Sequence, residues 1–160
     1  MIKLIAAVSK NRAIGINGGL IFNDKDDLAN FKKETINQVV IMGRKTWESL
    51  SKKPLSDRIN IVLTSSPETL PEGIRTISSV DEIPALEKEF LLEGKDIYII
   101  GGGHLYKETI GMADCLVISH FDTIAEGDTY FPKIDEDVFR CKYIKPTKNF
   151  TLKIYYKKHG

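Results

Sequence analysis

The sequence is poor in the residues that build metal sites and disulfides. Its 160 residues include only 2 cysteines and 3 histidines, which are scattered along the chain. We therefore expect no metal site, because such sites need several of these ligands at short, regular spacings. Cys115 and Cys141 both lie in apolar, strand-like segments, so we expect both to be reduced core residues.

An excess of one charge and long apolar runs are also lacking. The 23 basic and 22 acidic residues leave a net charge of +1, so nucleic-acid binding has no electrostatic support. No apolar run approaches the about 20 residues of a membrane span, so we expect no membrane association. Residues 1–4 lead directly into an apolar segment without a signal-peptide cleavage pattern, which favours a cytoplasmic protein.

The chain does contain a regular alternation of short apolar runs and helical stretches. Apolar residues make up 42% of the chain and charged residues 28%, as in ordinary globular proteins. We expect a single domain, residues 1–160, with an α/β fold. Its twisted, mostly parallel central sheet would have about eight strands, with an antiparallel C-terminal strand and about four flanking helices.

The expected elements follow from this alternation. Strands are expected at residues 2–8, 38–42, 60–63, 73–77, 97–100, 115–120, 139–144 and 150–156. Helices are expected at residues 25–34 and 79–90, and two further helices are expected to end near residues 50 and 110. Asp24 is the expected N-cap of the first helix, and Ser79 with Glu82 forms a capping box. Residues 9–23 are expected to form a long loop, which in a compact domain is usually functional or disordered.

One carboxylate stands out on the first expected helix. Asp27 lies one turn before Phe31, with Leu28 beside both, and we expect Leu28 and Phe31 to turn inward. An acid on that side is drawn into an apolar pocket, which raises its pKa. Such a group usually holds a cationic ligand or supplies a proton. Alternatively, Asp27 only balances the helix dipole, as Asp24 and Asp26 are expected to do.

Two glycine-containing turns follow apolar strands. The three glycines at residues 101–103 allow a ligand close to the backbone and precede a helix N-terminus, which suits a phosphate. Gly43 is followed by the cations Arg44 and Lys45 and the hydroxyl of Thr46. The hydroxyl residues Thr64 and Ser65 end the next strand. Because ligands bind at the carboxyl ends of parallel strands, these turns together predict a dinucleotide with an extra phosphate. Alternatively, residues 101–103 form only a tight strand-to-helix turn, although three glycines are more than a turn requires and favour phosphate binding, and residues 43–46 form only a solvated basic turn.

Arg58 and residues 127–129 are weaker signals. Arg58 precedes the third strand and could bind a ligand carboxylate through two parallel hydrogen bonds, or pair with Asp57 on the surface. Residues 127–129 form a turn by composition.

Several motifs, in order and spacing, carry a resemblance over essentially the whole chain. They are Ile5-Ala6-Ala7, Ile14-Gly15, Asp27-Leu28-Ala29-x-Phe31-Lys32, Val40-Ile41-Met42-Gly43-Arg44-Lys45-Thr46-Trp47-Glu48-Ser49, Ile100-Gly101-Gly102-Gly103-x-x-Tyr106 and Glu126-Gly127-Asp128-Thr129-x-Phe131-Pro132. The chain resembles dihydrofolate reductase of the bacterial type. The resemblance implies NADPH-dependent reduction of 7,8-dihydrofolate to 5,6,7,8-tetrahydrofolate by hydride transfer from the nicotinamide to the pterin.

The resemblance also implies the site residues. Asp27 would bind the pterin and assist its protonation, with Phe22 and Ser119 completing the catalytic group. Dihydrofolate, or an antifolate inhibitor, would contact Ile5, Ala6, Asp27, Leu28, Phe31, Lys32, Leu50, Leu55, Arg58, Ile100, Tyr106 and Ser119. NADPH would contact Ala7, Ile14, Gly15, Leu20, Gly43, Arg44, Lys45, Thr46, Leu63, Thr64, Ser65, Ile100, Gly101, Gly102, Gly103, His104, Leu105 and Tyr106.

Individual roles come with these sets. Arg58 would clamp the α-carboxylate of the glutamate tail, and Arg44 would be among the residues around the 2′-phosphate of the cofactor. Thr46 and the glycines at residues 101–103 would cradle the pyrophosphate. Residues 15–22, called the lid below, would exclude water while hydride moves, and Asp128 would support the lid by hydrogen bonds to its backbone.

The sequence departs from the family pattern near the acid. Ile21 and Phe22 stand where the family usually has Pro-Trp, and Phe22 lacks the indole N–H. Lys25 replaces a usual proline, and Ser119 replaces a threonine whose hydroxyl bonds Asp27. We expect activity to survive with altered lid dynamics and altered affinity for diaminopyrimidine antifolates. These departures lead to the hypothesis of an antifolate-tolerant enzyme, resistant to trimethoprim.

Two other functions are weighed against this one. A reductase of the same superfamily that acts on a ribosylated pyrimidine in flavin synthesis would share the fold and NADPH, but Asp27, Phe31 and Arg58 suit a pterin with a glutamate tail. A non-catalytic nucleotide-binding module would not need a complete substrate pocket. As a reductase the protein is expected to be a monomer.

Overall fold

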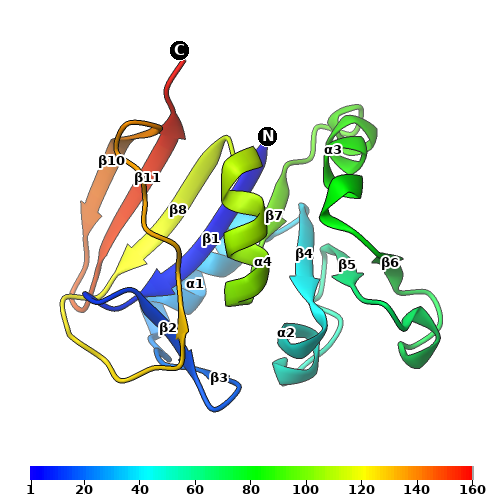
Figure 1. The fold of residues 1–160 in the computed structure, drawn as a ribbon, viewed down its shortest axis with the longest axis horizontal. Helices are drawn as coiled ribbons and strands as arrows, with labels where there is room; N and C mark the ends of the chain where they lie inside the picture. Colours follow the sequence, from blue (N-terminus) through cyan, green and yellow to red (C-terminus); the bar gives the residue numbers. More distant parts are fainter. Residues whose placement is uncertain (160) are drawn as a thin grey trace.

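The computed structural model describes residues 1–159, and its centre is one large sheet (Figure 1). The sheet has eight strands in the order β10-β11-β8-β1-β7-β4-β5-β6. Their bounds are β1 Ile2–Val8, β4 Val39–Gly43, β5 Ile59–Leu63, β6 Arg75–Ile77, β7 Ile97–Ile99, β8 Cys115–His120, β10 Phe139–Pro146 and β11 Thr151–Lys157. All pairs from β8 to β6 are parallel, and β11 is antiparallel to both of its neighbours. The predicted α/β sheet with an antiparallel C-terminal strand is confirmed.

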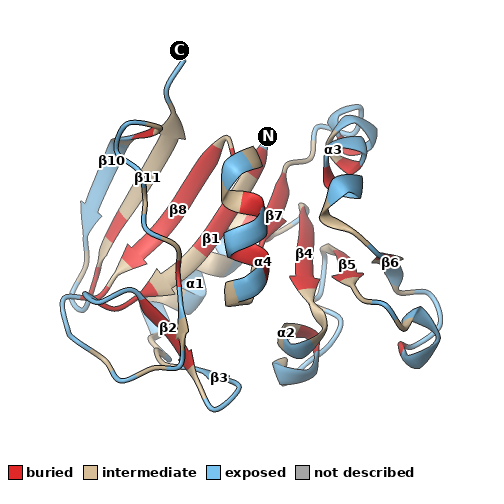
Figure 2. Cartoon of the chain, in the orientation of Figure 1, coloured by how far each residue is buried: buried red, intermediate tan, exposed pale blue. Residues whose placement is uncertain are grey.

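Continuous apolar runs form the central strands because both faces of the sheet are covered. Val39, Val40, Ile41 and Met42 are all 0% exposed along β4. Figure 2 shows the central strands as buried, while the outer surfaces of the helices are exposed. A parallel sheet with helices on both faces favours such runs over an alternation of apolar and polar residues.

Four helices cover the two faces of the sheet, as expected. They are α1 Lys25–Thr35, α2 Arg44–Ser49, α3 Ile83–Leu91 and α4 Gly103–Thr109. In Figure 1 α4 lies in front of the sheet and α1 behind it. Asp24 caps α1 by accepting hydrogen bonds from the backbone N–H groups of Asp26 and Asp27. The capping box of Ser79 and Glu82 is also present, but it opens a short 3-10 turn that leads into α3.

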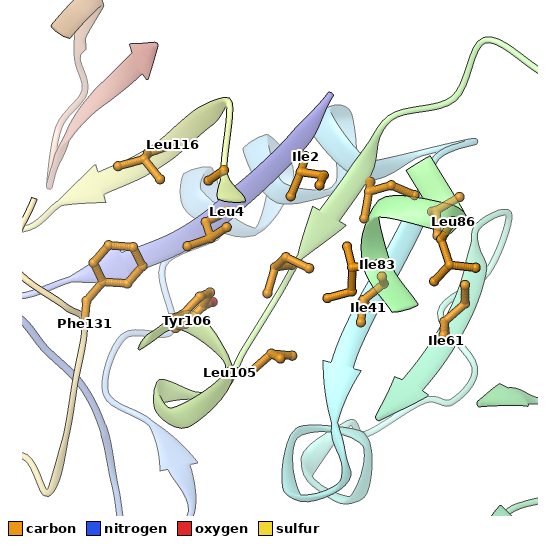
Figure 3. Close-up of a cluster of buried hydrophobic side chains, with 14 of the residues drawn as sticks. Ile2, Leu4, Ile41, Ile61, Ile83, Leu86, Leu105, Tyr106, Leu116 and Phe131 are labelled. Atoms are coloured by element: carbon orange, nitrogen blue, oxygen red, sulfur yellow. The ribbon is translucent and has the colours of Figure 1, made fainter. Parts of the chain in front are cut away.

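Two apolar clusters, one on each face, hold the helices to the sheet. On the front face Leu4, Ile41 and Ile61 of the strands meet α3 and α4 residues, among them Ile83, Leu86, Leu105 and Tyr106 (Figure 3). The back-face cluster is built around Ile5, Val40, Met42, Val62, Val117 and Trp47, and Phe22, Phe31, Leu50, Leu55 and Ile100 pack against it. The back-face cluster therefore supports most of the apolar side chains expected to bind substrate.

The prediction of one long loop without strands at residues 9–23 was wrong. Within it lie β2 Ala13–Ile16 and β3 Gly19–Leu20, which join β9 Thr129–Tyr130 in a small sheet of order β3-β2-β9. Strands this short and rich in glycine carry no readable alternation. Asn17 and Gly18, both with positive φ, form the tight turn between β2 and β3 and were a local hairpin signal. The pairing of β2 with β9, a segment far along the chain, has no such local signal.

The prediction that both cysteines are core residues was half right. Cys115 is buried on β8, whereas Cys141 is only half-buried. Cys141 belongs to β10, the edge strand of the sheet, where most residues are exposed. Both thiols are free. Among the helices of residues 1–159, none has the length and apolar content that a membrane span requires.

Candidate active site

Asp27 lies where α1 meets the carboxyl end of β8. Ser119 Oγ donates a hydrogen bond of 2.6 Å to Asp27 Oδ1. Asp27, Phe31 and Thr35 follow one another at the spacing of four residues that places side chains on one helix face, and Thr35, the last of them, is fully buried. The acid is thus on the inward face of α1, as the sequence predicted.

Burial raises the pKa of Asp27 above its ordinary value, and the nearby charge of Asp24 adds to that shift. The hydrogen bond from Ser119 acts in the opposite direction because it favours the carboxylate. Asp24 itself behaves differently, since hydrogen bonds from Asn149 and from the helix backbone lower its pKa. Only Asp24 therefore has the environment of an ordinary capping acid. The environment of Asp27 matches the functional interpretation of this acid rather than the dipole interpretation.

Leu28 does not turn inward, contrary to expectation. Its side chain is 50% exposed, whereas Phe31 is half-buried against the back-face cluster. Successive helix residues are separated by about 100° around the axis, so Leu28 lies at the rim of the inward face that Asp27 and Phe31 define. Leu28 is therefore exposed at the edge of this helix face, and Phe31 rather than Leu28 packs against the back-face cluster.

Arg58 is held beside this pocket by neutral oxygens. Its Nε donates to the carbonyl of Ser56 at 2.9 Å and its Nη1 donates to Thr35 Oγ1 at 3.0 Å. The guanidinium carbon lies 6.0 Å from the centre of the Phe31 ring. These contacts fix a cation at the end of the Phe31 wall, where a carboxylate at the far end of a substrate could be bound.

The two glycine turns lie side by side, as their positions at neighbouring strand ends predicted. Gly43 N donates to the carbonyl of Gly101 at 2.9 Å, and β4 is the neighbour of β7 in the sheet. Gly101 has a φ of +125°, and a Cβ there would lie 3.3 Å from Tyr106 Oη and 3.5 Å from Thr46 Oγ1. The Thr46 hydroxyl therefore faces the glycine turn at close range.

A cavity of about 690 Å³ lies beyond these turns. Five of the predicted cofactor residues line it, namely Arg44, Leu63, Thr64, Ser65 and His104. Six further residues line it that the sequence reading missed, namely Ser66, Thr69, Ser78, Ser79, Val80 and Glu108. Ser79 had been recognised only as a helix cap, because a capping serine carries no signal for ligand binding.

Arg44 is the main fixed cation of this cavity. Its Nε donates to Glu48 Oε1 at 2.9 Å, and its Nη1 donates to Thr69 Oγ1. Lys45, by contrast, is exposed and is not among the residues that line the cavity. The structure thus separates two neighbouring cations that the sequence treated alike.

Other predicted residues have their side chains elsewhere. Leu105 and Tyr106 belong to the front-face cluster, and Tyr106 Oη donates to the carbonyl of Ile5 at 2.6 Å. Leu20 is 80% exposed, and Lys32 is also exposed. For these residues a contact with substrate or cofactor stays a prediction.

The lid is tied to the loop around Asp128. Asn17 N donates to Asp128 Oδ2 at 2.9 Å, and Asp128 N donates to the carbonyl of Gly15 at 3.0 Å. Gly127 fits closely under β2, since a Cβ there would lie 2.9 Å from both Ala13 Cβ and the Gly15 carbonyl. The geometry agrees with the role of Asp128 that the resemblance implied.

The residues present fit a phosphorylated dinucleotide. The glycine turns expose backbone beside the Thr46 hydroxyl, and the adjoining cavity offers Arg44 with the hydroxyls of Thr64, Ser65 and Ser78. Guanidinium and hydroxyl donors of this kind suit phosphate groups. The Asp27 pocket lies along the same carboxyl edge of the sheet.

Comparison with known proteins identifies the family. A model of the dihydrofolate reductase family matches residues 1–156. A dihydrofolate reductase of Buchnera aphidicola is 42% identical over 153 residues, which cover 92% of each chain. That of Bacillus subtilis is 38% identical over 136 residues, covering 85% of this chain and 78% of its own. The solved dihydrofolate reductase of Enterococcus faecalis, complexed with NADP(H) and RAB-propyl, superposes with a TM-score of 0.88 at 32% identity, over 99% of this chain and 97% of its own. With its Asp27 pocket and paired glycine turns, the chain belongs to the dihydrofolate reductase family.

Proposed function

We propose that this protein catalyses the NADPH-dependent reduction of 7,8-dihydrofolate to 5,6,7,8-tetrahydrofolate. One observation carries the proposal. A half-buried acid held by Ser119 shares the carboxyl edge of the sheet with two glycine turns and a cavity lined by Arg44. This arrangement places an acid with a raised pKa and a set of phosphate-binding groups along one edge of the sheet, which suits hydride transfer between two flat rings.

NADPH, when bound, supplies the hydride. The residues of this chain hold it by its polar parts. Arg44, Thr64 and Ser65 surround the adenosine end with its 2′-phosphate, and the Thr46 hydroxyl with the glycines at residues 101–103 faces the pyrophosphate. The carbonyls of Ala7 and Ile14 would accept hydrogen bonds from the carboxamide and so orient the nicotinamide.

Asp27 binds the pterin and favours protonation of the ring nitrogen next to the carbon that receives hydride. Ser119 fixes the orientation of its carboxyl group, and burial keeps its pKa raised. The ring of Phe31 forms a wall of the pocket, and Arg58 binds the glutamate tail. The lid closes over these groups and excludes water.

The rival function, reduction of a ribosylated pyrimidine, uses the same cofactor. The contacts of Arg58 with Thr35 and its approach to Phe31 argue against it, because a ribosyl group needs no cation at the end of an aromatic wall. A non-catalytic nucleotide-binding module would need only the glycine turns and the cavity lined by Arg44, so the acid with a raised pKa on the same edge of the sheet favours a reductase.

The test follows NADPH absorbance with purified protein and either dihydrofolate or the ribosylated pyrimidine. We expect oxidation with dihydrofolate only. Asp27→Asn should lose about 10²–10⁴-fold in rate at neutral pH and recover part of it at low pH, where the substrate is already protonated. Failure of dihydrofolate to stimulate oxidation would overturn the function, and an unchanged neutral rate in the variant would overturn the role of Asp27.

We further propose that the enzyme acts as a cytoplasmic monomer and that residues 1–160 form one domain. The support is that β1, at the start of the chain, pairs with β7 and β8, so the sheet joins early and late segments. Gel filtration with light scattering should give one species near the chain mass of 18.0 kDa. A stable dimer mass would contradict the proposed monomer.

A further inference from the structure

The end of β8 supports the acid, and the residue that follows the strand supports the end of the lid. Ser119 lies on β8, and Phe121 comes directly after the last residue of that strand, His120. Phe121 belongs to the back-face cluster, against which Phe22 and Phe31 also pack. Ser119 holds Asp27. Phe121 lies flat against Phe22, with ring centres 4.0 Å apart and ring planes within 7°.

Phe121 is itself supported from behind. It is buried, and its ring centre lies 5.1 Å from that of Phe150, which is also buried. Phe150 belongs to the turn between β10 and β11, which closes on itself through Thr147: Thr147 N donates to the Phe150 carbonyl at 2.7 Å, and Phe150 N donates to Thr147 Oγ1 at 3.2 Å. The three rings of Phe22, Phe121 and Phe150, called the aromatic stack below, therefore rest on a hydrogen-bonded turn.

The same turn reaches past Phe22 to the helix cap. Asn149 Nδ2 donates to Asp24 Oδ2 at 2.7 Å. Asp24 is thus attached to this turn directly by a hydrogen bond, and Phe22 is attached to it through the ring of Phe121, only a few residues before Asp27. The other end of the lid is attached through Asp128 and Asn17, while Gly18, Gly19 and Leu20 between the two attachments are exposed.

We infer that Phe121 is a positioning residue, which, backed by Phe150, holds Phe22 and so fixes the end of the lid beside the Asp27 pocket. The inference deepens the proposed function and rests on it for its kinetic consequence. A favourable pair of aromatic rings contributes enough free energy beyond burial to change the population of an attached segment about two- to tenfold.

The first test measures amide hydrogen exchange of the lid in Phe121→Leu, with and without NADPH. Exchange in residues 15–24 should rise about two- to tenfold, with the β4 and β7 peptides unchanged. Phe139→Leu is the matched control, because Phe139 is equally buried but belongs to the front-face cluster. Phe150→Leu should give a smaller rise in the same residues. Unchanged lid exchange in Phe121→Leu, or an equal rise in Phe139→Leu, would overturn the inference.

The second test uses single-turnover hydride transfer. Phe121→Leu should slow this step about two- to tenfold while the Kd for NADPH, set at the far cavity, stays within about twofold. Adding Phe121→Leu to Phe22→Leu should cost little more than Phe22→Leu alone, because both remove one contact. Two results would contradict a positioning role for Phe121. One is that the rate losses of Phe121→Leu and Phe22→Leu add fully in the double variant, and the other is that Phe121→Leu weakens NADPH binding as much as it slows hydride transfer.

The two proposals fail in different ways. If wild-type protein shows no dihydrofolate-dependent NADPH oxidation, the proposed function fails, and the exchange experiment still decides whether Phe121 holds the lid. If wild-type protein oxidises NADPH in the presence of dihydrofolate but hydrogen exchange of the lid is the same in Phe121→Leu as in wild type, only the positioning role of Phe121 fails.

Discussion

Ser119 Oγ and Asp27 Oδ1, 2.6 Å apart, join the end of β8 to the first turn of α1. Two opposing influences meet at this hydrogen bond. Desolvation favours the neutral acid, and the hydroxyl donor favours the carboxylate; desolvation is the larger, so the pKa is raised. Folding thereby shifts the protonation equilibrium of Asp27 toward the neutral acid.

Asp27→Asn should make the protein more stable at neutral pH while removing activity. Because the pKa of Asp27 is raised by folding, the folded state binds more protons than the unfolded state between the two pKa values, so wild-type stability falls as pH rises through that window. Urea unfolding at several pH values checks this. The advantage of the variant should vanish below about pH 4, where the acid is neutral in both states.

Asp26→Asn serves as the control for that measurement. Asp26 is exposed in the same helix turn, where an acid is favoured by the helix dipole. This change should give no gain in stability at neutral pH. An equal gain in both variants would show that helix charge, rather than burial of Asp27, governs the effect.

Arg58→Lys should raise the KM for dihydrofolate about ten- to hundredfold with little change in kcat. The guanidinium is held by Ser56 and Thr35 in a fixed orientation, and lysine cannot reproduce two parallel hydrogen bonds to a carboxylate. A dihydropterin that lacks the glutamate tail is the control, and steady-state kinetics should give it the same kcat/KM with both proteins. A loss of similar size with the tailless substrate would refute the clamp.

Arg44→Gln should weaken NADPH binding about tenfold or more and leave NADH binding unchanged, because only NADPH carries the 2′-phosphate. Lys45→Gln should have a much smaller effect, since Lys45 is exposed outside the cavity that Arg44 lines. Fluorescence titration of both variants with both cofactors gives the four affinities. Equal effects of the two substitutions would place the phosphate elsewhere.

Phe22→Trp should tighten inhibition by trimethoprim about two- to tenfold, because the indole N–H restores a donor beside the pocket. Phe22→Leu, which removes the ring and adds no donor, should not tighten it. Inhibition constants for the three proteins test the hypothesis of antifolate tolerance. If wild type and Phe22→Trp are inhibited equally, the missing donor does not explain tolerance.

The central fold was predictable because its signals are local and redundant. The buried run of β1, the Asp24 cap and the glycines after β7 each agree with the observed element. Parallel topology then brings the ends of β7, β4 and β5 together, so even the neighbourhood of the two phosphate-binding turns followed from pattern and general rules.

The parts that escaped prediction depend on partners distant in sequence. The pairing of β2 with β9 and the stacking of Phe22 on Phe121 leave no periodic trace in either segment. The inward face of α1 was assigned correctly to Asp27 and Phe31, but Leu28 proved exposed because its angle about the helix axis, rather than its hydrophobicity, decides its position. Apolar character alone therefore does not show whether a helix residue packs against the core or lies exposed at the edge of the helix face.

The place of β1 between β7 and β8 also bears on how the protein is made. Ile2 pairs with Ile97, and Lys3 pairs with Cys115, so the first strand to be synthesised has its pairing partners in the second half of the chain. Contacts of such long sequence separation form slowly, and until then the strand edges are open to other chains. Asp27 likewise meets Ser119 only at this late stage. The surroundings of Asp27 are therefore complete only after synthesis has passed Ser119.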